Sequence, residues 1–138
     1  MIKIDIDDRE VKKELARLVG RVQDRRPLMR KIAGIMHDAV EENFEQEGRP
    51  KWKPSKRAMK QSGKTLQDTG QMAKSVTEEY DNDSALVGTN KKYAAIQHFG
   101  GKAGRGKKVT IPARPFLKLT DSDLEEIKEA VKEHLRKG

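Results

Sequence analysis

The most regular pattern in the chain is a series of apolar residues that recur every three or four positions after Pro27. The residues on this face are Leu28, Ile32, Ile35, Met36, Ala39, Val40 and Phe44. The spacing predicts a helix from Pro27 to about Gln46 with a wide buried face. Pro27 suits its first position, because proline lacks an N–H that would have no partner there. His37 lies beside the face without a second residue at metal-ligand spacing, so we interpret it as structural.

Two narrower apolar stripes predict one helix before and one helix near the end of the chain. The first stripe consists of Val11, Leu15, Leu18 and Val22. The second lies between Thr120 and Arg136, with Asp121 or Ser122 at the helix start, and consists of Leu124, Ile127, Val131 and Leu135. Both stripes lie on otherwise charged segments, which is typical of surface helices that bury one side.

Shorter patterns predict strands between these helices. The segments with strand-like patterns are residues 1–6, 76–80, 84–88 and 109–111. The second and third are joined by a turn at residues 81–83 and should pair antiparallel. Residues 93–99 predict a short helix that ends at Gly100. The fold class is therefore α+β: N-terminal helices packed on a small antiparallel sheet, closed by a C-terminal helix, in a single domain of residues 1–138.

The few aromatic residues suggest where a core is built. Two of the three Phe and one of the two Tyr lie between residues 85 and 117. We therefore expect Tyr93, Phe99 and Phe116 to share a core with Leu117. Trp52 stands among lysines, and we interpret it as a pin that holds its loop to the domain, with the indole N–H finding a partner. A stacking platform for single-stranded nucleic acid is the alternative.

Composition narrows the class of protein. The 138 residues are 34% hydrophobic and 38% charged, which predicts a small, thinly packed core. No apolar run approaches the roughly 20 residues of a membrane span. The absence of cysteine excludes disulfides and thiolate chemistry and suits a reducing cytoplasm.

The net charge of +8 is concentrated in two segments. Residues 49–64 carry seven basic residues and residues 100–118 carry six, without an acid in either segment. The rest of the chain contains the other 17 basic residues and all 22 acids, so its charge is −5. This asymmetry predicts basic loops at 47–64 and 100–108 that contact a polyanion or an acidic face of a partner. The alternative is that both loops are simply solvated. The glycine-rich loop at 100–108 has too little apolar surface to order itself, so we expect it to stay mobile or to order on assembly.

Catalytic motifs are absent from the sequence. It contains no nucleophile elbow, Walker loop, zinc-protease motif or calcium loop. His98 is the best-placed candidate base, but no nucleophile or carboxylate is set near it, and we interpret its ring as filling the end of the short helix. We therefore predict a protein that is not an enzyme and needs no cofactor or metal.

Four sequence blocks occur in a set order between Phe44 and Leu117. They are Phe44 itself, Gly48 with Trp52-Lys53-Pro54, LQDTGQMAKS at residues 66–75, and VGTNKKYAAIQHFGG at residues 87–101 followed by IPARPFL at residues 111–117. In order and spacing these blocks resemble the phage virion morphogenesis family, whose members complete or join the tail in Mu-like and related phages and prophages. The residues that the resemblance marks as a structural motif are Trp52, Tyr93, Phe99, Gly100, Pro112, Arg114, Pro115 and Phe116.

The resemblance implies a structural protein of the tail terminus or head–tail interface that forms a homo-oligomeric ring. The implied partners are tail-tube and head-connector proteins, with no membrane and no small-molecule substrate. Assembly would take place in the host bacterial cytoplasm, after which the protein would stay in the virion.

A ring requires one patch of each subunit to meet a different patch of its neighbour. The charge pattern suggests a basic side made of Lys102, Arg105, Lys107 and Lys108. It suggests an acidic side made of Glu41, Glu42 and Glu45. DNA in the lumen is a second possible target of the basic loop. The alternative function is a free-standing nucleic-acid-binding protein, and a hydrolase centred on His98 is a third hypothesis.

Overall fold

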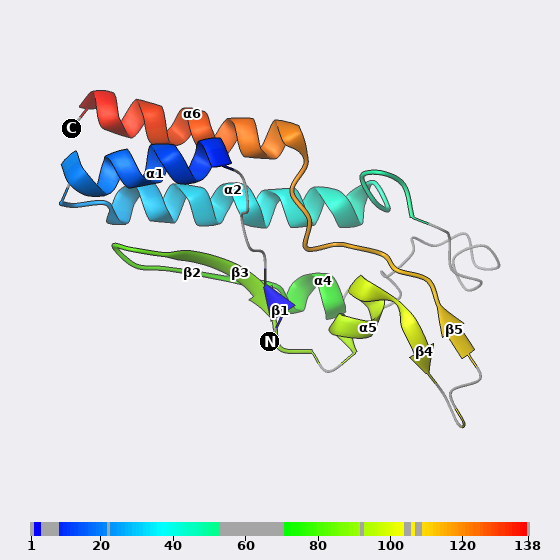
Figure 1. The fold of residues 1–138 in the computed structure, drawn as a ribbon. Helices are drawn as coiled ribbons and strands as arrows, with labels where there is room; N and C mark the ends of the chain where they lie inside the picture. The colour runs from blue at the N-terminus through cyan, green and yellow to red at the C-terminus, as the bar shows by residue number, and fades with distance from the viewer. Residues whose placement is uncertain are drawn as a thin grey trace.

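The structure is a computed structural model of the 138-residue chain. It describes residues 2–3, 9–21, 23–52, 71–91, 93–103, 106 and 109–137. Three long helices stack on one side of a small antiparallel sheet, with one helix next to the sheet and the other two, including the C-terminal helix, beyond it (Figure 1). The predicted α+β class is confirmed.

The central helix is α2, Arg26–Glu45, which lies between the sheet and the C-terminal helix. Its apolar face is wide because it packs against both neighbours at once. The buried residues on it are Leu28, Met29, Ile32, Ala33, Ile35, Met36, Ala39, Val40, Asn43 and Phe44. Pro27 is the second residue of the helix, one position after the predicted first one, and the predicted end also differs from the observed one by a single residue.

The two flanking helices, α1 (Arg9–Arg21) and α6 (Asp121–Lys137), pack against each other, and α6 also packs against α2. Val11 and Leu18 on α1 and Ile127 and Val131 on α6 are buried, as the narrow stripes predict. The other described stripe residues, Leu15, Leu124 and Leu135, are half-buried, and Ala130 of α6 is buried although it lies outside the predicted stripe. A stripe of this width covers one side of a helix only, so the opposite sides remain charged and exposed.

The sheet has the strand order β1-β3-β2, with β1 at Ile2–Lys3, β2 at Thr77–Tyr80 and β3 at Ala85–Thr89. The predicted hairpin of β2 and β3 is confirmed, and its register pairs Tyr80 with Ala85 and Thr77 with Gly88. The Asp81 carboxylate closes the turn by accepting the N–H groups of Asp83 at 2.8 Å and Ser84 at 2.7 Å. These bonds, led by the one from Asp83, lower the pKa of Asp81 from its ordinary value.

The remaining elements extend from the sheet to the far end of the molecule. They are α4 at Gln71–Ser75, α5 at Ala94–Phe99, β4 at Gly101–Ala103 and β5 at Val109–Ile111. β4 and β5 pair antiparallel. They form a two-stranded arm that projects at the opposite end of the molecule from the β2–β3 turn (Figure 1). The arm joins α5 at Gly100, where φ is 76° and a Cβ would lie 2.7 Å from the backbone nitrogen of Ala113.

The prediction of an unstructured loop at 100–108 is wrong at its start, because residues 101–103 are a strand. The segment has little apolar surface, and the backbone hydrogen bonds between β4 and β5 order it instead. Residues 47–52, the start of the predicted basic loop at 47–64, form a compact turn. Residues 53–64 and most of the tip between β4 and β5 lie outside the described part of the chain.

The core contains Phe116, which has no exposed surface, and Leu117, which is 7% exposed. The prediction that Phe99 and Tyr93 share this core is wrong, since Phe99 is 69% exposed and Tyr93 is 43% exposed. A six-residue helix such as α5 presents only one narrow stripe to the core, and the stripe includes Ala94. His98, rather than Phe99, places its ring edge-on against Phe116, with the ring centroids 5.4 Å apart.

Candidate functional site

The turn after α2 places Trp52 in the core. Gly48 has a φ of 105° and donates its N–H to the Asn43 carbonyl at 2.7 Å, and Trp52 donates its backbone N–H to the Glu47 carbonyl at 2.8 Å. The indole, 6% exposed, packs edge-on against Phe44 with 6.0 Å between ring centroids. This position is the one that the pin interpretation predicts. The expected partner of the indole N–H is not found among the described residues.

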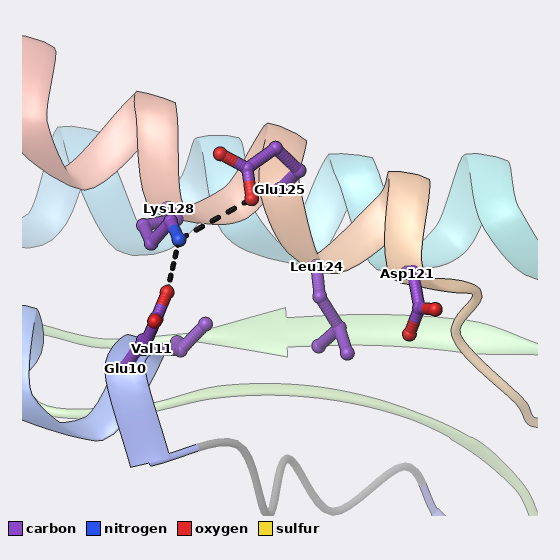
Figure 2. A pocket seen from close by; sticks show the side chains of 6 residues that line it. All are labelled: Glu10, Val11, Asp121, Leu124, Glu125 and Lys128. Atoms are coloured by element: carbon purple, nitrogen blue, oxygen red, sulfur yellow. Dashed lines mark hydrogen bonds and ion pairs between the residues drawn. The ribbon is translucent and has the colours of Figure 1, made fainter.

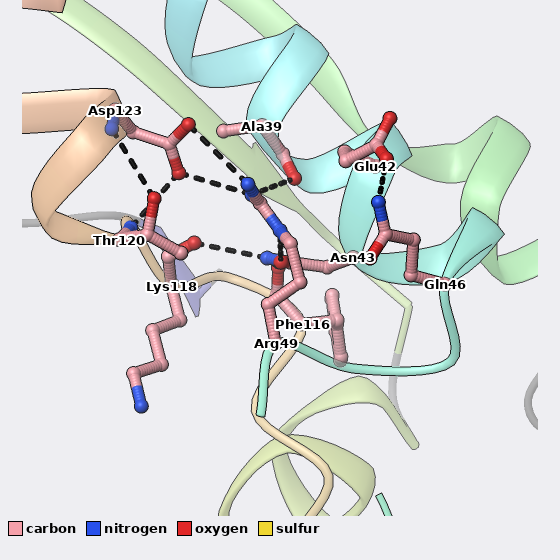
Figure 3. A network of polar contacts seen from close by, with 9 residues as sticks. All are labelled: Ala39, Glu42, Asn43, Gln46, Arg49, Phe116, Lys118, Thr120 and Asp123. Atoms are coloured by element: carbon pink, nitrogen blue, oxygen red, sulfur yellow. Dashed lines mark hydrogen bonds and ion pairs between the residues drawn. The ribbon is translucent and has the colours of Figure 1, made fainter. Parts of the chain in front are cut away.

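Arg49, in the same turn, is the centre of a polar network (Figure 3). It donates from Nε to Asn43 Oδ1 at 2.7 Å, and from Nη2 to the Ala39 carbonyl at 2.8 Å and Asp123 Oδ2 at 3.0 Å. Asn43 in turn donates to the carbonyls of Phe116 at 2.7 Å and Lys118 at 2.9 Å. The network therefore joins the end of α2 to the start of α6 and to the extended segment between the arm and α6.

α6 begins at Asp121, one of the two residues predicted at its start, and the residue before it provides the cap. Thr120 is the capping residue, since its Oγ1 accepts the N–H of Asp123 at 3.2 Å. Asp123 Oδ2 accepts the N–H of Thr120 at 2.8 Å in return. This reciprocal pair is a capping box, and it orients the Asp123 carboxylate toward Arg49.

Two cations that the charge count assigned to partner contacts belong to the interior of the subunit. Arg49 is one of the seven basic residues in the first segment, and its ion pair with Asp123 is largely buried. Arg114 is one of the six in the second segment. It is 7% exposed, its N–H donates to the Gln97 carbonyl at 2.9 Å, and burial lowers its pKa. The basic surplus available to a partner is smaller by these two charges.

Of the four residues of the predicted basic side, Lys102 alone lies in the part of the chain that the structure describes. Lys102 is exposed in β4, paired with Thr110 of β5, and forms no ion pair with another described residue. Arg105, Lys107 and Lys108 lie outside the described residues. Phe99 lies at the base of the arm, where its ring contacts only the edge of His98 among the described rings, at 4.6 Å between centroids. The arm thus combines a cation with an exposed aromatic ring at its base.

The predicted acidic side lies at the last turns of α2. Glu41 is exposed, and its carboxylate lies 3.7 Å from His37 Nε2. Glu42 is half-buried and accepts a hydrogen bond from the Gln46 amide. Glu45 is exposed. No ion pair joins Lys102 to Glu41 or Glu42 within the described part of the subunit, so any such contact would be between subunits.

A second acidic surface, which the sequence reasoning missed, lies along β2. This strand is the edge of the sheet, and all four of its residues are exposed. It contains Glu78 and Glu79, and Asp81 and Asp83 follow in the turn. Glu78 lies on the α2 side, where its carboxylate is 3.2 Å from His37 Nδ1. Glu79 alternates to the opposite face of the sheet.

The hypothesis of catalysis at His98 gains no support from the structure. Nδ1 of His98 accepts the N–H of Leu117 at 3.3 Å, and the ring is packed between Phe99 and Phe116. Burial lowers the pKa of His98. An imidazole in this position fills the end of α5, which is the structural role predicted from the sequence. No cluster of three potential metal ligands is found among the described residues.

A shallow cavity of about 290 Å³ between α1 and α6 has an acidic rim (Figure 2). Lys128 bonds Glu10 across the gap and Glu125 on its own helix, and these partners, Glu10 first, raise the pKa of Lys128. The ammonium is thereby neutralised, and we interpret the cavity as a helix contact. No helix in the described part of the chain combines the length and the apolar character needed to cross a bilayer.

The family model described as the phage virion morphogenesis family matches residues 6–136 of the chain. The chain belongs to this family. It is 50% identical over 137 residues to the Mu-like prophage FluMu G protein 2 of Haemophilus influenzae, covering 99% of this chain and 97% of the relative. It is 29% identical over 147 residues to the putative capsid assembly protein G of Escherichia phage Mu, covering 97% and 94%. No solved structure matches the chain significantly.

The family of phage virion morphogenesis proteins is one of structural assembly components, so this chain has a structural role in phage assembly.

The polar network around Arg49 had two detectable signals in the sequence. Asn43 is a polar residue in the apolar stripe of α2, and Thr120-x-x-Asp123 is a capping-box spacing before an apolar run. The acidic surface along β2 had a weaker signal: residues 77–79 lie in a predicted strand, and none of them is apolar.

Proposed function

We propose that the chain completes or joins the phage tail at the head–tail interface, as a ring of identical subunits. Membership of the morphogenesis family supports a structural role in assembly. The observation that carries the finer proposal is the placement of charge, with a basic arm at one end of the subunit and acidic residues on α2 and β2. The segments are separate in one subunit, which leaves both sets available to neighbours.

This charge arrangement favours head-to-tail contacts over a symmetric dimer. In a symmetric contact through the arm, Lys102 would face a second copy of a basic segment, and like charges across an interface cost several kcal/mol. A contact between the basic arm and an acidic surface of the next subunit is attractive and leaves both subunits with one unused patch. Repeating it generates a ring when the rotation closes.

The proposed partners are tail-tube subunits on one side of the ring and head-connector subunits on the other, with DNA passing through the lumen. The relative in phage Mu is named for capsid assembly, and a protein at the junction would contact the head as well as the tail. The proposed place of assembly is the host cytoplasm, followed by the virion. No catalytic step is part of the proposal, since His98 is occupied in the fold.

Co-sedimentation of the purified chain with tail-tube subunits and with head-connector subunits tests this proposal. We expect binding to at least one of them, and only weak binding to DNA. Tight DNA binding by the monomer, with no binding to either structural protein, would contradict the proposal and favour a free-standing nucleic-acid-binding protein. In that case the DNA affinity would fall steeply with salt, by roughly one unit of logarithmic slope per phosphate contact.

A further inference from the structure

Building on the ring proposed above, we infer that the β4–β5 arm of one subunit pairs along the open edge of β2 in the next. Each three-stranded sheet would then be continued by two strands from its neighbour. This inference goes beyond the ring itself, because it names the two surfaces in contact and replaces the predicted end of α2 as the acidic side.

Among the described residues, no strand pairs with the outer edge of β2. Within the described part of the chain β2 pairs with β3 alone, and all four of its residues are exposed. Sheet edges of soluble proteins are commonly guarded by lysine, proline or a bulge, because the unpaired N–H and C=O groups can bind another strand. Thr77–Tyr80 contains neither lysine nor proline, and its register with β3 is continuous from end to end.

The charge of the edge selects which strand can bind there. Glu78 and Glu79 would oppose each other if two copies of β2 paired, and like charges directly opposite destabilise a strand pair. A basic strand is free of this penalty. Lys102 in the middle of β4 is such a cation, and its exposed side chain forms no ion pair with another described residue. The edge is therefore unfavourable for self-pairing of β2 and complementary to the arm.

The arm, for its part, lacks a third strand. It has three residues in each strand, and among the described elements its extensive contacts are between those two strands alone. A single two-stranded hairpin is marginally stable in water, whereas three strands or more with a packed face are stable. Its base is fixed to the subunit by the bond between the Arg114 N–H and the Gln97 carbonyl. A strand from a neighbour would supply the missing ladder.

The receiving edge is held rigidly, which lowers the entropic cost of binding. Arg25, 9% exposed, donates its backbone N–H to Asn82 Oδ1 at 2.6 Å and its Nε to the Asn82 carbonyl at 3.2 Å, and its guanidinium pairs with Asp83. Asn82 also donates to the Gln23 carbonyl at 2.9 Å. The β2–β3 turn is thereby fastened to the segment between α1 and α2.

Geometry favours this edge over the end of α2 as the acidic side. The β2–β3 turn and the arm lie at opposite ends of the subunit, which suits a head-to-tail chain (Figure 1). At the end of α2, Glu41 contacts His37 and Glu42 is bonded to Gln46, and on β2 Glu78 also contacts His37, whereas Glu79 forms no ion pair with a described residue. The side chains at the end of α2 also offer no row of backbone donors and acceptors to an incoming strand, whereas β2 offers both charge and backbone.

Crosslinking tests the contact directly, because the chain has no cysteine of its own. The double variant Lys102→Cys/Glu79→Cys, treated with a short thiol-to-thiol crosslinker, should give a ladder of covalent multimers up to the size of the ring. Each single-cysteine variant should stay monomeric on a denaturing gel, and a mixture of the two should stop at dimers. Lys102→Cys/Glu126→Cys is the matched control, since Glu126 is exposed on α6, and it should give no ladder.

The competing contact is tested by Lys102→Cys/Glu41→Cys under the same conditions. A ladder from this variant and none from the Glu79 variant would overturn our inference and assign the acidic side to α2, while the ring would stand. Wild-type rings with no ladder from either variant would also overturn it. A wild-type chain that forms no complex at all would instead contradict the proposed function, and the pairing would fall with it.

Charge reversal provides an independent test by native mass spectrometry. Lys102→Glu and Glu79→Lys should each weaken assembly by about tenfold per contact, because an attractive pair becomes a repulsive one. An equimolar mixture of the two variants should recover assembly, in complexes with an even number of subunits, because each subunit then has complementary neighbours on both sides. Failure of the mixture to assemble, when both variants are folded, would contradict the pairing.

Discussion

Replacing Arg49 by alanine should destabilise the subunit although the residue lies in a segment that looks like a solvated basic loop. The substitution removes four donor contacts, to Asn43, Ala39 and both oxygens of Asp123. It leaves a carboxylate and a buried amide oxygen without their cation. Breaking a buried ion pair from one side costs about 3–5 kcal/mol. The side chains of Arg49 and Asp123 are 18% and 12% exposed, so we expect a value near the lower end, about 3 kcal/mol.

Thermal unfolding followed by circular dichroism measures this loss. For a domain of this size a change of about 3 kcal/mol corresponds to a fall in Tm of roughly 10 °C. Arg49→Lys should lose less, because it keeps the charge but not the forked geometry. Lys51→Ala, an exposed neighbour, should change stability by less than about 0.5 kcal/mol. If Arg49→Ala melted together with Lys51→Ala, the network would not hold the fold as we describe.

Three further predictions follow from the core and the arm. Phe116→Ala should cost about 3–5 kcal/mol, whereas Phe99→Ala should cost less than about 0.5 kcal/mol, and urea unfolding compares them. Burial lowers the pKa of His98, so the unfolded chain binds the proton more readily and stability should fall as the pH drops below about 6.5. His98→Asn keeps an acceptor for the Leu117 N–H and should remove part of this dependence of stability on pH. Gly100→Ala should cost about 1–3 kcal/mol, measured by thermal unfolding, because φ is 76° and the new Cβ would clash with the backbone. Equal stability of Phe116→Ala and wild type, an unchanged pH slope in His98→Asn, or a neutral Gly100→Ala would each contradict the packing described here.

Periodicity predicted the parts of the fold in which burial decides the structure. The wide face of α2 could be predicted from the sequence because a helix between two layers must repeat apolar residues along two sides. The β2–β3 hairpin could be predicted from its turn residues, since Asp81 bonds its own backbone two and three residues on. Both signals lie within one continuous stretch of sequence.

The parts that failed depend on contacts between distant segments. Phe99 and Phe116 are equally apolar, and only the short length of α5 and the position of His98 leave one exposed and the other buried. From the sequence Arg49 is predicted to be a solvated cation, because its partner Asp123 lies more than 70 residues later, in α6. The exposed edge of β2 is a further feature that depends on distant segments, because strand order is set by pairing and not by the sequence of one strand.

The native mass of the purified wild-type chain tests the central claim, that this family member assembles head to tail through unlike surfaces. We expect a single closed species of three or more copies of the 15.7 kDa subunit, with the same number of copies at every protein concentration above its assembly threshold. A chain that remains a monomer at all concentrations, or that stops at a symmetric dimer, would contradict the claim.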